Sequence, residues 1–120
     1  MKKTIIYFVS EDWYFYSHRL PIARAAYNKG FKVVVATRIH KHEDLIKSEG
    51  FELYPISINR GSLNPLSDIK TIVSLYKCYK KYNPDIVHQV AIKPVIYGTL
   101  VARLIGSIKI VNAITGLGFV

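Results

Sequence analysis

The residues of this sequence that could do chemistry stand just after its apolar runs. Glu11 and Asp12 follow the first run, and their carboxylates could accept hydrogen bonds from sugar hydroxyls but would repel a pyrophosphate. Residues 13–16 are all aromatic, and their flat faces would suit a sugar ring, a lipid interface or packing over a sheet edge. Residues 10–16 contain no glycine, so the Gly-x-Gly-x-x-Gly fingerprint and the P-loop are both missing after this run. The segment favours a neutral, sugar-like ligand over a dinucleotide.

Three cationic side chains stand where helices are expected to begin. His18 and Arg19 open one helical pattern, where backbone amides and a guanidinium could hold an anionic group, and a surface or capping role fits equally well. Lys93 stands just before Pro94 at the expected start of another helix. It is a candidate phosphate contact for the same reason.

A polar loop follows the third apolar run. Arg60 and Asn64 lie there with Ser62, a set of side chains that suits a sugar or a phosphate. An ordinary turn set by Gly61 and Pro65 explains the same residues equally well.

Histidine and cysteine supply the remaining candidates. His88 falls near the carboxyl end of the fourth apolar run, where it could hydrogen-bond a transferred sugar or stabilise charge, or else be a buried structural residue. His40 and His42 have no third ligand at a sensible spacing, so no metal site is expected. Cys78 has no second cysteine, which excludes a disulfide framework and fits a half-buried helix residue in a reducing cytosol.

The elements that must position these residues alternate along the whole chain. Strands rich in Ile, Val, Phe or Tyr are expected over residues 3–10, 31–37, 51–58, 85–90 and 108–114. Helices are expected over residues 17–28, 42–48, 67–82 and 94–105, with Gly30, Gly50 and Gly106 after three of them. This alternation predicts an α/β fold, a Rossmann-like parallel sheet flanked by helices with strand order 3-2-1-4-5. Ligands should then bind beyond the carboxyl ends of the strands.

The composition of the chain limits the classes of partner that it is expected to bind. A chain of 120 residues that is half apolar suits one domain, and its net charge of +9 favours an anionic partner such as a phosphorylated lipid, a membrane surface or a nucleic acid. The lysines are spread over several elements and no nucleic-acid-binding motif is present, so a nucleic acid is not expected. Residues 4–9 are too short for the apolar core of a signal peptide, and no uncharged run reaches the ~18 residues of a membrane span.

Two of the expected helices have patterns that bear on a membrane. The helix over residues 67–82 combines Ile69, Leu75 and Tyr79 on one side with lysines elsewhere. A core-facing helix with a solvated lysine face is favoured, and attraction to an anionic bilayer is the alternative. The helix over residues 94–105 is apolar nearly all round, which predicts burial beneath further sheet, a partner chain or a membrane.

Four segments in order along the chain carry a resemblance to a known family. The chain is similar to family-4 glycosyltransferases, in particular those that build bacterial lipid-linked surface glycans. The resemblance runs along essentially all 120 residues and corresponds to the amino-terminal, acceptor-side domain of a GT-B fold. The segments that carry it are Ser10-Glu11-Asp12-Trp13, Ser17-His18-Arg19-Leu20-Pro21-Ile22-Ala23-Arg24-Ala25, Ser62-Leu63-Asn64-Pro65 and Pro84-Asp85-Ile86-Val87-His88.

The resemblance implies a function for this half. It would receive a lipid-linked or surface-polysaccharide acceptor, in related enzymes often a sugar on undecaprenyl pyrophosphate, at the cytoplasmic face of the inner membrane. The nucleotide-sugar would be a substrate bound mainly by a second domain carrying a Glu-x7-Glu motif, which no pair of glutamates in this sequence matches. Related transferases typically retain the anomeric configuration and need no metal, so no resident cofactor is expected, and no catalytic residue is assigned. The acceptor-binding candidates are Glu11, Asp12, His18, Arg19, Arg60, Asn64, His88 and Lys93.

The last residues bear on domain organisation. Residues 115–118 are typical of a strand-to-helix loop with no helix after it, so we expect residues 1–120 to be an incomplete acceptor-binding domain without its donor-binding domain. Such a half should be inactive alone, because transfer needs both substrates held in one cleft. The alternative hypothesis is a non-catalytic membrane-docking subunit that partners a separate donor-binding chain.

Overall fold

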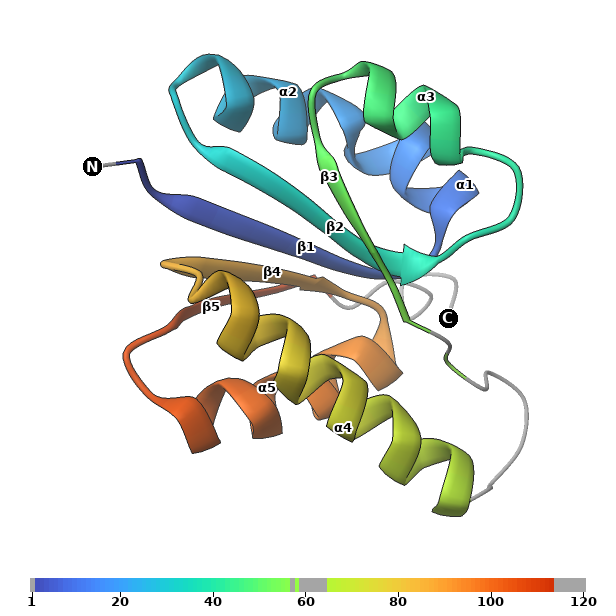
Figure 1. The fold of residues 1–120 in the computed structure, drawn as a ribbon, viewed down its shortest axis with the longest axis vertical. Coiled ribbons are helices and arrows are strands. Elements are labelled where there is room, and N and C mark those ends of the chain that lie inside the picture. Colours follow the sequence, from blue (N-terminus) through green and yellow to red (C-terminus); the bar gives the residue numbers. More distant parts are fainter. Residues whose placement is uncertain (1, 57, 59–64, 114–120) are drawn as a thin grey trace.

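The computed structural model describes residues 2–56, 58 and 65–113 (Figure 1). Its five strands are β1 (Thr4–Glu11), β2 (Lys32–Arg38), β3 (Glu52–Pro55), β4 (Ile86–Val90) and β5 (Lys109–Ala113). They form one sheet in the order β3-β2-β1-β4-β5, and all four neighbouring pairs are parallel. The predicted α/β fold and strand order are therefore confirmed. The expected strand over residues 51–58 was too long, since β3 covers only Glu52–Pro55, although the Ile56 amide still donates to the carbonyl of Thr37 at 3.0 Å.

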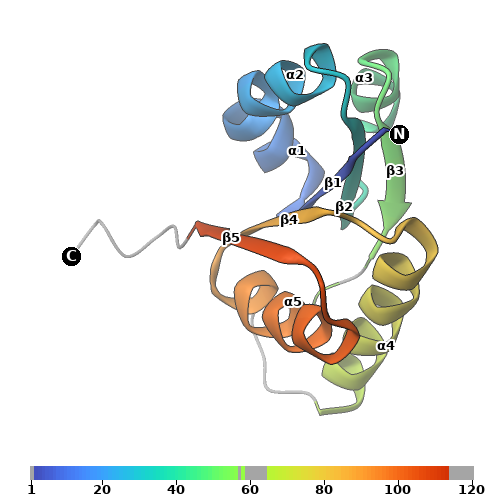
Figure 2. The same cartoon turned by 90° about the vertical axis from the view of Figure 1, so that its left-hand side faces the viewer.

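Helices cover both faces of the sheet (Figures 1 and 2). One layer holds α1 (Asp12–Tyr14), the π-helical turn η1 (Phe15–Arg19), α2 (Leu20–Asn28) and α3 (Glu43–Ser48). The other layer holds α4 (Pro65–Tyr82) and α5 (Ile92–Ile105). Gly30 and Gly50 have φ values of +97° and +91°, which confirms the predicted glycine stops after α2 and α3.

The first helical segment begins earlier than the sequence predicts. We expected the helix to begin at residue 17, but the backbone is helical from Asp12 onward and widens into a π-helical turn at Phe15–Arg19. Pro21 explains the widened turn. In a regular α-helix its ring would clash with the carbonyl of residue 17. The helix avoids this clash by widening into a π-helical turn just before the proline.

Two other helices also begin early. α4 starts at Pro65, two residues before the expected start, so Ser67 lies inside the helix, where its carbonyl accepts a hydrogen bond from the Thr71 hydroxyl. α5 starts at Ile92, which places Pro94 in the first turn, where its missing N–H costs nothing. In the part of the chain that is described, no helix is both long and apolar enough to cross a membrane.

The strands divide the apolar core into two parts. On β1, Ile6 and Phe8 face the α4–α5 layer, while Tyr7 and Val9 face the layer of α1 to α3. Cys78 is fully buried, not half-buried as predicted, and burial raises the pKa of its thiol to about 12. Such a thiol is a packing residue and not a nucleophile.

A buried amide ties β4 to its neighbours. Gln89 accepts a hydrogen bond from the Tyr79 hydroxyl at 3.0 Å, and its amide nitrogen donates to Asn112 Oδ1 at 2.7 Å and Thr99 Oγ1 at 3.2 Å. Gly98 of α5 packs directly on this amide, and a Cβ there would lie 1.9 Å from Gln89 Oε1. Since three hydrogen bonds hold the Gln89 side chain, moving it away from an added methyl group at position 98 would cost free energy.

We therefore expect Gly98→Ala to lower the free energy of unfolding by about 1–3 kcal/mol, measured by urea denaturation. In a Gln89→Ala background the clashing atoms are gone, so the same change should cost nothing or stabilise the helix. An equal loss in both backgrounds would contradict this account.

Candidate functional site

A cleft lies at the position where ligands bind in sheets of this kind. The direction in which successive strands are added to the sheet reverses between β1 and β4, and this is the switch point of the sheet. At the carboxyl ends of these two strands lies a cleft of about 170 Å³. It is lined by Val9, Ser10, Glu11, Trp13, Tyr14, Val90 and Ala91. The site thus combines an apolar floor, two aromatic rings, one hydroxyl and one carboxylate.

The aromatic run divides between cleft and core. Trp13 is 44% exposed and meets the Tyr14 ring edge-on at a centroid distance of 5.8 Å. Tyr14 in turn stacks on His18, with centroids 4.3 Å apart and planes inclined by 14°. Phe15 is fully buried against Tyr7. Packing on the sheet is therefore confirmed for Phe15, while Trp13 and Tyr14 line the cleft.

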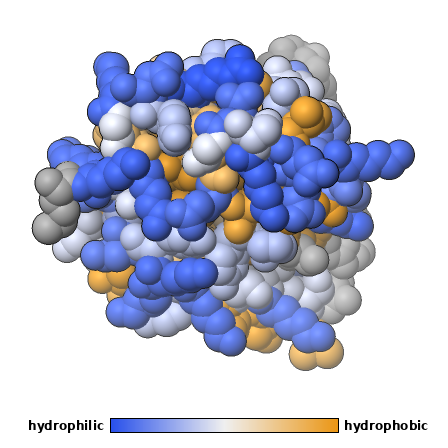
Figure 3. Space-filling model, turned by 45° about the horizontal axis from the view of Figure 1, so that its top comes forward, coloured by the Kyte–Doolittle hydropathy of each residue, from blue (hydrophilic) through white to orange (hydrophobic). Residues whose placement is uncertain are grey.

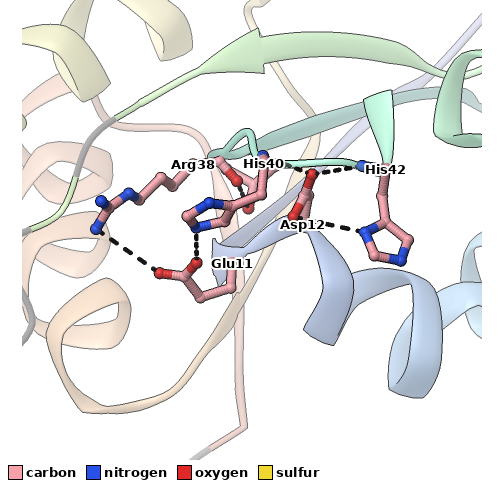
Figure 4. A network of polar contacts seen from close by, with 6 residues as sticks. Glu11, Asp12, Arg38, His40 and His42 are labelled. Carbon is pink, nitrogen blue, oxygen red and sulfur yellow. Dashed lines mark hydrogen bonds and ion pairs between the residues drawn. The ribbon is translucent and has the colours of Figure 1, made fainter. Parts of the chain in front are cut away.

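Asp12 holds the loop that follows β2 (Figure 4). Its carboxylate is fully buried and accepts hydrogen bonds from the backbone amides of His40 at 2.8 Å and His42 at 2.9 Å, with His42 Nδ1 3.9 Å away. Burial disfavours the charged form, but these amides and that of Trp13 outweigh it and hold the pKa of Asp12 below its ordinary value. Asp12 is thus a positioning group for the edge of the site.

Glu11 is bound in the same corner. One carboxylate oxygen contacts His40 Nε2 directly, and the other lies 4.0 Å from Arg38 Nη1 (Figure 4). The side chain is almost buried. At the cleft wall, the negative charge of Glu11 thus lies beside one cationic side chain, Arg38, and one polar side chain, His40.

Arg38, His40 and His42 were not among our predicted binding residues. The signal was available, because Arg38 ends β2, His40 and His42 follow it, and the carboxyl ends of β1 and β2 meet at one edge of a parallel sheet. Within residues 2–56, 58 and 65–113, no group of three His, Cys, Asp or Glu side chains is arranged to hold a metal ion.

A pair of polar rings, Tyr7 and His88, lies where β1 and β4 meet within the sheet. His88 is the third residue of β4, in register with Tyr7, and their rings are 5.3 Å apart. Burial, followed by the charge of Arg19, lowers the pKa of His88, and burial raises that of Tyr7 to about 12, so both are neutral near pH 7. Among the described residues, none hydrogen-bonds Tyr7 Oη, His88 Nε2 or Arg19 Nε. His88 therefore lies near the carboxyl end of β4, as predicted, but it is Val90, the last residue of the strand, that lines the cleft.

The other candidates are scattered around this centre. His18 is exposed, and both His18 and Arg19 lie in the π-helical turn, so the expected helix start at these residues is wrong and its free amides are not available to an anion. Lys93 is the second residue of α5 and its Nζ lies 3.8 Å from Asp68 of α4. Arg60 and Asn64 lie outside the described residues.

One backbone feature marks the cleft. Ala91, between β4 and α5, has φ of +80° and ψ of 165°, a region that residues other than glycine rarely occupy. Its amide donates to the carbonyl of Ala113 at 2.9 Å, and its own carbonyl accepts from Val95 at 3.0 Å. These bonds hold the strained turn so that the chain can pass from the sheet into α5 beside the cleft.

Together, the parallel sheet and its strand order define a Rossmann-like α/β fold, with a cleft at the switch point. The sequence matches the family model described as "Glycosyl transferase 4-like" over residues 4–120, and the chain belongs to this family. A 58-residue segment is 38% identical to an Escherichia coli protein, "UDP-Gal:alpha-D-GlcNAc-diphosphoundecaprenol alpha-1,3-galactosyltransferase", and covers 48% of this chain and 15% of that protein. The family that the sequence resembled is therefore confirmed.

Solved structures show the same fold. A glycosyltransferase from Rickettsia africae superposes with a TM-score of 0.71 at 20% identity, covering 92% of this chain and 29% of that one. MurG from Acinetobacter baumannii superposes with a TM-score of 0.74 at 21% identity, covering 92% of this chain and 34% of that one. The chain spans about a third or less of the length of these relatives.

The role of Asp12 predicts a dependence of stability on pH. Since the folded-state pKa of Asp12 lies below the unfolded value of about 3.9, its contribution is present above about pH 4 and is lost as the pH falls through the folded-state pKa. Asp12→Asn should cost about 1–3 kcal/mol at pH 7 and remove part of this acid sensitivity, as measured by denaturation from pH 2.5 to 7. Glu43→Gln, which breaks an exposed pair with Lys47, is the control and should cost less than about 0.5 kcal/mol. Equal effects of the two variants would refute the assignment.

Proposed function

We propose that this chain is the acceptor-binding half of a retaining GT-B glycosyltransferase. The enzyme would transfer a sugar from a nucleotide-sugar to a lipid-linked or surface-polysaccharide acceptor at the cytoplasmic face of the inner membrane. One observation carries the proposal: a chain of the glycosyl transferase 4-like family has an aromatic-walled cleft at the switch point of its sheet. The name of the Escherichia coli relative, which includes a nucleotide-sugar and a diphosphoundecaprenol-linked sugar, supports the proposed substrate classes.

The cleft suits a sugar better than a free phosphate. Trp13 and Tyr14 offer ring faces, on which the C–H groups of a sugar can lie, and the Ser10 hydroxyl and Glu11 carboxylate offer hydrogen bonds to sugar hydroxyls. Glu11 at the cleft wall opposes a pyrophosphate in the cleft itself. We place the anionic part of the acceptor nearer to Arg19 and Lys93, and retain Asp12, His18, Arg60, Asn64 and His88 as acceptor-side candidates that bind or position.

Donor binding is assigned to a part other than residues 1–120. That part is either a further domain of the same protein or a separate chain, and the mass of the native protein together with co-purification distinguishes the two. In both cases catalysis depends on bringing the two halves of the cleft together, because proximity and orientation supply several kcal/mol of the rate enhancement.

Trp13→Ala should raise the KM for the acceptor about tenfold with a smaller change in kcat, because a ring face that contacts the ground state is lost. Trp13→Phe should recover most of the affinity. Tyr27→Ala, an exposed aromatic residue on α2 away from the cleft, is the matched control and should leave the KM unchanged. The measurement is a steady-state transfer assay with varied acceptor, and an unchanged KM for Trp13→Ala would overturn the placement of the acceptor.

Residues 1–120 produced alone should bind a soluble acceptor analogue but transfer no sugar. Calorimetric titration and a radiolabelled transfer assay measure the two properties, after circular dichroism has confirmed the folded state. Addition of a donor-binding part should restore transfer. Turnover by residues 1–120 alone at the rate of the complete enzyme would refute the two-part proposal.

A further inference from the structure

The turn between β4 and α5 contains a residue type that its backbone conformation does not favour. Ala91 has φ of +80° and ψ of 165°, a region that glycine enters freely and that strains any residue with a Cβ. Ala91 is also the N-cap residue of α5, and its side chain makes no capping hydrogen bond. Alanine is among the poorest residues at an N-cap, where glycine is better. Two local preferences therefore favour glycine at a position where the chain has alanine.

The other end of α5 provides an internal comparison. Gly106, which follows the helix, has φ of +82° and ψ of 165°, so its backbone conformation is nearly that of Ala91. Within the described part of the chain, a Cβ added to Gly106 would meet no atom within 4 Å. The chain thus has glycine where a methyl group in this conformation would touch nothing, and alanine where the same conformation borders the cleft.

The turn itself does not need the methyl group of Ala91. The Ala91 amide donates to the carbonyl of Ala113 at 2.9 Å, and the Ala91 carbonyl accepts from the amide of Val95 at 3.0 Å. Both hydrogen bonds use backbone atoms only, so a glycine at position 91 would form them equally well. Because the methyl group adds strain to the turn and no bond, its place beside the cleft is what accounts for it.

Ala91 belongs to the apolar floor of the cleft. Val9 of β1 and Val90, the last residue of β4, line the cleft with it, and both valines are almost fully buried. Over α2 and α3, by contrast, the surface is largely hydrophilic, with apolar atoms mainly in a hollow near its middle (Figure 3). The side chains of Val9, Val90 and Ala91 offer no donor or acceptor, so the part of a ligand that rests on them should itself be apolar.

We propose that Ala91 is a specificity-determining residue whose methyl group favours an acceptor sugar that carries a methyl substituent. Such a substituent, in an acetamido group or in a deoxy sugar, would pack on Val9, Val90 and Ala91 without losing a hydrogen bond. A hydroxyl group in the same place would lose its hydrogen bonds to water and gain none from these side chains. The inference rests on the proposed function, since it names the class of sugar that the cleft receives.

The variant Ala91→Gly separates stability from selectivity in the protein at its natural length. It should raise the melting temperature by a few degrees, because the strain is relieved while the backbone hydrogen bonds persist. Gly106→Ala introduces the same strain away from the cleft, so it is the matched control and should lower the melting temperature. A lower melting temperature for Ala91→Gly would mean that the turn needs the methyl group, and this result would overturn the proposal.

Selectivity is measured by calorimetric titration with two pairs of soluble probes. The first pair is the octyl diphosphate esters of N-acetylglucosamine and glucose, and the second is those of D-fucose and D-galactose. The unaltered protein should bind the methyl-bearing member of at least one pair more tightly. Ala91→Gly should reduce that ratio of Kd values about fourfold, the factor that corresponds to one buried methyl group, and Gly106→Ala should leave the ratio unchanged. The pair that responds identifies the substituent as acetamido or deoxy.

The contrary outcomes are distinct. Equal ratios in the unaltered protein and in Ala91→Gly would overturn the proposal, even if both members of a pair bind more weakly, because a loosened turn weakens both alike. A reduced ratio in Gly106→Ala would overturn it too. If the unaltered protein binds none of the four probes, the proposed function fails and the inference falls with it, whereas binding without a change of ratio removes the inference alone.

Discussion

The parallel pairing of β1 with β4 is the constraint on which the site depends. Tyr7 and His88 stand in register across this pair, and the strand order turns away from it on both sides. At that point the segment that follows β1 and the segment that follows β4 leave the sheet toward opposite faces. The two segments therefore separate and leave a cleft between them. The cleft is thus a consequence of topology, and its chemistry follows from which residues happen to end the two strands.

Buried polar groups then fix what topology leaves open. Asp12 is the first residue after β1, and its carboxylate holds the backbone after β2. A carboxylate that is itself shielded from solvent therefore fixes the loop beside the cleft. Gln89 does the same inside the sheet, where it joins β4 to β5, α4 and α5. Both groups would be costly without their partners, and this cost favours one arrangement of the loops over others.

Much of this could be predicted from the sequence, and the failures have physical causes. The alternation of apolar runs with helical patterns predicted the sheet and its order, because handedness and short connections leave few alternatives. His88 lies near the end of β4 as predicted, but periodicity locates a strand and not which of its residues line a cleft, and Val90 lines it where His88 does not. The helical start at Asp12 was missed because a π-helical turn leaves no pattern that a 3.6-residue period detects. Arg38, His40 and His42 were missed as partners because their contacts with Glu11 and Asp12 link different strands.

The α4–α5 layer carries more apolar surface than the sheet uses. A helix that only covers a sheet needs one apolar stripe, and its outer side is normally polar. Here Leu100 and Leu104 remain outside although α5 already buries Val101 and Ala102, so core packing among the described residues does not account for them. Exposed apolar side chains in such number are typical of a surface that something else covers.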